Sequence, residues 1–162
     1  MASLTTERHR VRSPSFPFIP LREAVERARV FYQKEKRHAA PPQVAVSYWG
    51  YSSLKSSGGP RTIAALRSYG LLEGDEEVRL TDRAISLLRE EATEDERLGV
   101  LRELARLPSA HRIVWDAFGA DLPSDATLSH FLVEKLGFKL ESAGGVLRNY
   151  REALGFAGLM AG

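Results

Sequence analysis

The residues best suited to bind an anion lie in the stretch YSSLKSSGGPR, residues 51–61. A helix is expected to begin at the end of this stretch, and the first N–H groups of a helix have no backbone partner. Small residues such as Ser57 let a phosphate approach these groups, and Lys55 and Arg61 add positive charge. The stretch therefore predicts either phosphate contact or a flexible loop that a serine caps without a ligand. It does not match a nucleotide-binding loop, because the spacing G-x-x-x-x-G-K-[ST] is missing.

The sequence offers little for catalysis or metal binding. His9, His38, His111 and His130 never occur at the H-x-x-x-H spacing of metal ligands, and we expect each to lie at the surface or the edge of the core. Cysteine is absent, which excludes disulfides, thiolate metal sites and a cysteine nucleophile. There is no G-x-S-x-G elbow and no dinucleotide-binding fingerprint. We expect no enzyme activity, no metal and no cofactor.

Apolar residues recur at helical spacing along most of the chain, which predicts a mainly α-helical fold. The first expected helix covers residues 21–36 and turns its charged side chains, Arg27 among them, to solvent. A short second helix is expected over residues 43–49. A third helix carries Ile63 and Leu66 on its apolar side and ends at Gly70, which suits a left-handed stop.

A two-stranded ribbon and further helices are expected after Gly70. Residues 71–80 hold two short apolar segments on either side of an acidic turn, as a small hairpin requires. The Thr81 hydroxyl is expected to cap the following helix, and Thr93 with Glu96 forms the pattern of a capping box. The remaining helices are expected over residues 94–107, 109–118, 125–136 and 143–154.

The segment PRTIAALRSYGLLEGDEEVRLTDRAISLL, residues 60–88, resembles the recognition helix, wing and following helix of winged helix-turn-helix proteins. The resemblance covers roughly residues 20–90, and its most specific part is the "LT" that opens the helix after the wing. It is similar to many bacterial transcription regulators. It implies a winged helix-turn-helix with a short two-stranded wing, followed by a C-terminal helical bundle. The whole chain, with its FPFIPL start and FAGL end, also resembles a family of small bacterial proteins, which implies no function.

The winged-helix resemblance implies that the third helix contacts duplex DNA. Arg61 and Thr62, near its N-terminal end, would reach base edges, where arginine suits guanine and threonine suits a thymine methyl group. Arg67 would contact a phosphate. Lys55 and Ser57, on the preceding turn, complete the predicted contact set.

The first residues of the sequence carry a basic cluster. Arg8, His9, Arg10 and Arg12 lie within five positions, and the first 40 residues hold nine Lys and Arg against four Asp and Glu. We expect residues 1–15 to form a flexible basic arm. In one interpretation Arg10 and Arg12 contact DNA, as the arms of homeodomains do, and in the other the arm is only a solvated terminus.

A length of 162 residues suits one ordinary domain, or two small helical units that share a core. We expect a winged-helix domain at residues 16–91 and a C-terminal helical domain at residues 92–162, which packs on the first or mediates a homodimer. No apolar run approaches the ~20 residues that cross a membrane. The start of the sequence also lacks the apolar core of a secretory signal. We therefore expect a cytoplasmic protein.

The expected wing is acidic, which departs from the DNA-binding pattern. Its tip holds Glu73, Asp75, Glu76 and Glu77, with only Arg79 to offset them. DNA would repel these carboxylates, so the third helix and the arm would bind without the wing. The favoured hypothesis is a DNA-binding transcription regulator. The alternative is a protein–protein interaction module whose acidic wing binds a basic protein partner.

Overall fold

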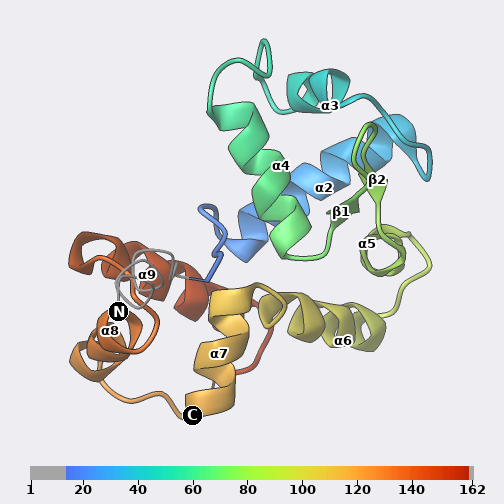
Figure 1. The fold of residues 1–162 in the computed structure, drawn as a ribbon. Helices are drawn as coiled ribbons and strands as arrows, with labels where there is room; N and C mark the ends of the chain where they lie inside the picture. Colours follow the sequence, from blue (N-terminus) through green and yellow to red (C-terminus); the bar gives the residue numbers. More distant parts are fainter. Residues whose placement is uncertain (1–13, 161–162) are drawn as a thin grey trace.

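The computed structural model describes residues 14–160, which form eight helices and one two-stranded antiparallel sheet (Figure 1). The expectation of a mainly helical protein with a small hairpin is therefore confirmed. Within this part of the chain, none of the helices has the length and apolar character needed to cross a membrane. The elements are α2 (Leu21–Glu35), α3 (Pro42–Tyr48), α4 (Gly58–Ser68), β1 (Leu72–Glu73), β2 (Arg79–Leu80), α5 (Asp82–Leu88), α6 (Glu94–Ala105), α7 (Ser109–Phe118), α8 (Asp125–Glu134) and α9 (Leu140–Phe156).

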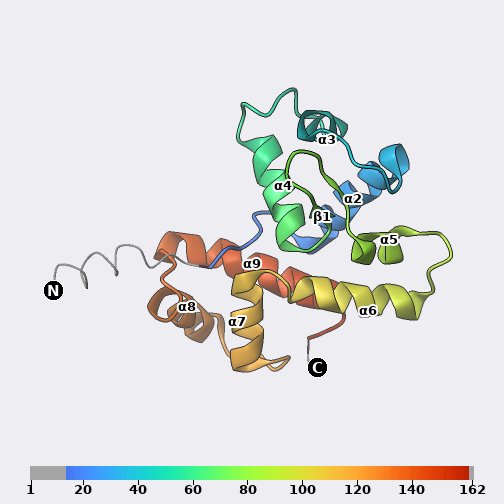
Figure 2. The ribbon, with the colours of Figure 1, turned by 45° about the vertical axis from the view of Figure 1, so that its right-hand side comes forward.

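The described residues form two hydrophobic cores. The first core lies among α2, α3, α4, the sheet and α5, and includes the fully buried Phe31, Leu66 and Tyr69. The second core lies among α7, α8 and α9, and includes Leu132 and Tyr150. Figure 2 shows α6 and α9 side by side beneath the body formed by α2 to α5, and both helices contact that body.

The division between the cores does not fall at the expected boundary, residue 92. Leu104 and Ala105 of α6, and Ala153 and Ala157 at the end of α9, belong to the first core. These residues are small or sit on one helix face, so they allow close packing of α6 and α9 against α2 and α5. The C-terminal helices therefore complete the core of the N-terminal part.

The end of α4 and the start of α5 follow the predicted local signals. Gly70 has a φ of 77°, and Leu71 N donates to Leu66 O at 2.8 Å, which ends α4. The Thr81 hydroxyl accepts a hydrogen bond from Ala84 N at 3.1 Å, and so caps α5. It also donates to Gly70 O at 2.6 Å, so one side chain joins the end of α4 to the start of α5.

The hairpin is held beside α2 as well as α4. β1 and β2 pair antiparallel, with Leu72 opposite Leu80. Ala40, in the link between α2 and α3, adds an isolated antiparallel bridge to Val78, with two backbone hydrogen bonds of 2.8 and 2.9 Å. Gly74 makes the turn possible, because its φ is 101° and a Cβ there would lie 2.1 Å from Glu77 O.

The segment Ser15–Ile19, called the strap here, connects the two cores. Ser15 O accepts from Ala110 N of α7 at 3.1 Å, and Pro17 O accepts from the Asn149 side chain of α9 at 3.0 Å. At its other end, Ile19 O accepts from the Tyr69 hydroxyl at 3.0 Å. The strap is thus an extended anchor, as its proline content predicts.

Candidate nucleic-acid interface

One face of α4 is exposed and carries two of the predicted contact residues. Arg61, Ala64 and Arg67 recur three residues apart, so they follow one another around an arc of about 120° on the helix, and all three are exposed. The opposite side holds Ile63 and Leu66 in the first core. We call the exposed side the α4 face. It presents two guanidinium groups separated by a small methyl side chain.

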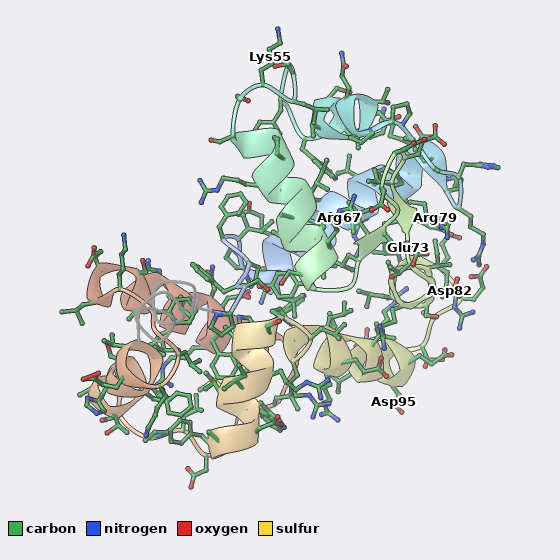
Figure 3. The ribbon with its side chains drawn as sticks, in the orientation of Figure 1. Lys55, Arg67, Glu73, Arg79, Asp82 and Asp95 are labelled. Atoms are coloured by element: carbon green, nitrogen blue, oxygen red, sulfur yellow. The ribbon has the colours of Figure 1, made fainter. Side chains whose placement is uncertain are left out.

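Lys55 and Ser57 extend the α4 face past the start of the helix. Both are exposed, and Figure 3 shows Lys55 at the tip of the loop before α4, with Arg67 at the other end, beside the hairpin. Ser57 occupies the N-cap position, but its side chain makes no capping hydrogen bond. The predicted serine cap is therefore wrong, and the choice between a phosphate-binding stretch and a loop without a ligand stays a prediction. Nor does α4 carry an acidic side chain in its first turn, so its N-terminal dipole is uncompensated there.

Thr62 does not belong to the α4 face, and its predicted contact with a base edge is wrong. The residue is fully buried. Its hydroxyl donates to Gly58 O at 2.9 Å and accepts from Arg27 Nη1 at 3.1 Å. The hydroxyl therefore satisfies groups inside the protein, and its methyl group is covered.

Arg27 was expected to face solvent, but it holds three elements together. Besides Thr62 of α4, its Nη1 donates to the Tyr51 hydroxyl at 3.0 Å, and its Nη2 pairs with Glu23 at 2.9 Å. The indole N–H of Trp49 donates to Arg27 O at 2.9 Å. The hydrogen bonds with Thr62 and then Arg27 lower the pKa of Tyr51. This network fixes the loop before α4 against α2.

The sequence did contain a signal for the position of Arg27. It lies three residues after Ala24 and four residues before Phe31, and both of these are fully buried. A residue at this spacing lies on the edge of the buried helix face. The pair with Glu23, one helical turn away, was the competing signal and indicated a solvent-exposed position.

Each arginine of the α4 face already has one intramolecular contact. The Arg61 guanidinium carbon lies 4.3 Å from the centroid of the Phe18 ring. Arg67 Nη1 lies 3.9 Å from Asp75 Oδ1, in the hairpin turn. A shallow groove between the strap and α4 separates the two arginines, and Phe16 and Ala64 contribute to its lining. Both cations remain exposed to solvent.

The acidic hairpin turn is adjacent to this face. Glu73, Asp75, Glu76 and Glu77 are all exposed, and only Glu73 and Asp75 have cationic partners within the described chain, Arg79 and Arg67. Figure 3 shows Glu73 and Arg79 together on the hairpin, where their side-chain atoms are 3.1 Å apart. The hairpin therefore carries a negative potential close to the α4 face, as its sequence predicts.

The predicted contacts of Arg10 and Arg12 lie outside the described residues. The described chain begins at Pro14, and the next residue, Ser15, lines the groove beside α4. The first described residues therefore lie at the edge of the α4 face.

The described residues contain no group of three or more His, Cys, Asp or Glu side chains that could hold a metal ion. His111 is not at the surface or the core edge as expected, because it is buried between the two cores. Its Nδ1 lies 2.9 Å from Ala105 O, and its ring meets those of Tyr69 and Tyr150 edge-on. Burial lowers the pKa of His111 to about 4.

Comparisons of the chain with protein-family models, with curated proteins and with solved structures gave no match. The features of the described residues that bear on function are the cationic α4 face and the acidic hairpin beside it.

Proposed function

We propose that the protein binds duplex DNA through the α4 face and acts as a transcription regulator with a winged helix-turn-helix. Two features of the fold support this proposal. Helices α3 and α4 pack against each other, as the two helices of a helix-turn-helix do, although residues 49–57 form a longer connection than the usual turn of three or four residues. The bridge between Ala40 and Val78 holds the hairpin beside the link between α2 and α3, and β1 contacts α4, which supports the assignment of the hairpin as a wing.

The observation that carries the proposal is the shared exposure of Arg61 and Arg67 on one side of α4. Cationic side chains on a helix that is exposed on one face can contact the backbone of DNA, and phosphate contacts supply most of non-specific affinity. Ala64, between them, is small enough to let the helix approach a groove closely. Lys55 would add a phosphate contact beyond the start of α4. In a homodimer, two such helices would lie about one DNA turn apart.

The burial of Thr62 reduces the number of α4 residues that could contact base edges. Of the two residues expected to contact base edges, only Arg61 is exposed. Arginine reads guanine through two parallel hydrogen bonds in the major groove. We therefore assign direct base contact on α4 to Arg61, and backbone contact to Arg67 and Lys55.

The test is a fluorescence anisotropy titration with a labelled mixed-sequence duplex at several salt concentrations. The two phosphate contacts of Arg67 and Lys55 predict that log K falls with log salt at a slope of about −2. The double variant Arg61→Ala/Arg67→Ala should bind at least about tenfold more weakly, with a slope shallower by about 1. The matched control, Arg112→Ala/Arg148→Ala, removes the same charge from exposed positions on α7 and α9. Absence of binding at low salt, or equal losses in both double variants, would refute the proposal.

The acidic hairpin supports a second candidate, a protein–protein interaction module. Glu76 and Glu77 are exposed and have no cationic partner within ion-pair distance in residues 14–160. They could bind a Lys- and Arg-rich segment of a partner protein. A labelled basic peptide should then bind the wild type at low salt and fail to bind Glu76→Lys/Glu77→Lys. The same variant should bind DNA more tightly if the first proposal holds, so the two functions give opposite results.

A further inference from the structure

A recess between α5, α6 and α7 is lined by three arginines, two carboxylates, a leucine and a tryptophan. Its volume is about 390 Å³, within the range of small-molecule sites. None of its lining residues belongs to the α4 face. A ligand of the recess would therefore bind at a site separate from the proposed DNA interface.

The arginines that line the recess outnumber its carboxylates, so the recess favours an anionic ligand. Arg83 is neutralised by Glu103, whose Oε2 lies 2.9 Å from its Nε. Arg106 and Arg112 also line the recess, and neither has a carboxylate within ion-pair distance in the described part of the chain. Two guanidinium groups are therefore available to an incoming carboxylate or phosphate.

Arg106 is held in place before any ligand arrives. Its Nε donates to Arg102 O at 3.0 Å, and its guanidinium carbon lies 5.1 Å from the centroid of the Trp115 ring. These contacts restrict the side chain but leave its terminal N–H groups without a hydrogen-bond partner among the described residues. A group fixed in this way loses less entropy when it binds an anion.

Trp115 and Leu107 give the recess an apolar part. Trp115 is half-buried and lines the recess, so the part of its indole that Arg106 and the second core leave uncovered offers apolar surface to a ring. Leu107 packs against the end of α4, where a Cβ on Gly70 would lie 2.6 Å from Leu107 Cδ1. Asp116, the second carboxylate, can accept a hydrogen bond from an N–H group on such a ring.

We propose that this recess is a binding site for a small anionic ligand with a flat ring that bears an N–H donor. Arg106 and Arg112 would bind the anionic group, the ring would lie against Trp115, and Asp116 would accept from the donor. Aromatic carboxylates and nucleoside monophosphates share this chemistry. They differ in the anion, which is flat in a carboxylate and tetrahedral in a phosphate.

The two tryptophans of the chain make the test internally controlled. In a proton–nitrogen NMR spectrum each indole N–H gives a separate signal, and Trp49→Phe assigns them. The probes are 4-aminobenzoate for the carboxylate class and AMP for the phosphate class, with 4-aminobenzamide and adenosine as their neutral counterparts. At least one anionic probe should shift the Trp115 signal saturably, while the Trp49 signal stays in place and the neutral counterpart has a much weaker effect.

The Arg112→Ala variant should weaken binding of the anionic probe about tenfold, the effect of one lost charge-assisted hydrogen bond. Arg112 is exposed, and its side chain makes no hydrogen bond with the described residues; its backbone N–H donates to Pro108 O, a hydrogen bond that the alanine variant keeps. Arg148→Ala, an exposed arginine on α9 outside the recess, is the matched control and should bind like the wild type. The proposal is overturned if neither anionic probe gives a saturable shift. It is also overturned if the neutral counterparts bind equally well, or if both variants lose the same affinity.

Discussion

Arg67 Nη1 and Asp75 Oδ1 are 3.9 Å apart, so the last cation of the α4 face is paired with the tip of the acidic hairpin. The two residues lie on different elements, and the Asp75 side chain is fully exposed. An approaching phosphate would have to compete with this carboxylate for Arg67. Under the proposed function, the hairpin therefore weakens DNA binding instead of supporting it.

Replacement of Asp75 by asparagine should strengthen DNA binding. The change frees Arg67 and removes one negative charge near the α4 face, and exposed ion pairs of this kind contribute up to about 1 kcal/mol. We expect about a two- to fivefold gain in affinity at low salt, measured by anisotropy. Asp121→Asn, on the link between α7 and α8, makes the same charge change away from α4 and should have little effect. Unchanged affinity in Asp75→Asn would contradict competition for Arg67.

Thr62→Val should reduce stability and leave DNA binding unchanged. The variant keeps the shape of the side chain but removes the hydroxyl that bonds Gly58 O and Arg27 Nη1. Leaving buried groups without partners costs about 1–2 kcal/mol, which urea unfolding would detect. DNA affinity should stay within about twofold of the wild type, because the side chain is covered. A variant of normal stability with weakened DNA binding would restore Thr62 as a contact residue.

Because His111 is buried, the free energy of unfolding should decrease in mild acid. Burial lowers its pKa to about 4 from an ordinary value of 6.5. As the pH falls from 6.5 towards 4, the unfolded chain binds a proton that the folded chain does not, so the free energy of unfolding decreases. The total loss from this group is about 3 kcal/mol.

The measurement for His111 is urea unfolding at a series of pH values across this window. The variant His111→Phe keeps a ring between Tyr69 and Tyr150 and should flatten this part of the stability profile. His130→Gln, an exposed histidine on α8, should retain the wild-type slope. An unchanged slope in His111→Phe would show that other groups cause the acid sensitivity.

Gly74→Ala should destabilise the hairpin. The backbone there has a φ of 101°, and the new Cβ would overlap the carbonyl oxygen of Glu77. Strain of this kind costs about 1–3 kcal/mol, so the thermal midpoint should fall. Gly144→Ala is the matched control, because a Cβ at that position in α9 meets nothing within 4 Å. Alanine in a helix interior should even raise stability by roughly 0.5–1 kcal/mol.

Local signals in the sequence predicted the elements well. Gly70 ends α4, Thr81 caps α5, and Thr93 forms the predicted capping box with Glu96. Each of these signals depends on residues no more than four positions apart, so one sequence is enough to detect it. The start of α9 is an exception: the helix begins at Leu140, before the expected residue 143.

Long-range contacts explain what the sequence did not predict. Thr62 is polar, and only its partner Arg27, 35 residues away, makes its burial favourable. His111 is likewise buried because α4 and α9 supply Tyr69 and Tyr150. The exposure of Lys55, Arg61 and Arg67, by contrast, follows from periodicity and loop composition.

The arginine recess also depends on tertiary packing. Arg106 and Arg112 flank Pro108, which separates α6 from α7. Only the angle between these helices brings both guanidinium groups to one recess, and no spacing rule in the sequence predicts that angle. A search for polar residues near Trp115 would have included Arg112, three positions away on the same helix.

The contribution of α9 to the first core determines when this protein can complete its folding during synthesis. Helices α2 to α5 leave the ribosome long before Ala153 and Ala157, which cover part of their apolar surface. The strap likewise cannot form its hydrogen bond with Asn149 until that residue, 132 positions after Pro17, has been synthesised. Until α9 emerges, the nascent chain exposes a patch that chaperones can recognise. A ribosome that stalls before α9 would therefore release an aggregation-prone fragment in place of a stable N-terminal domain.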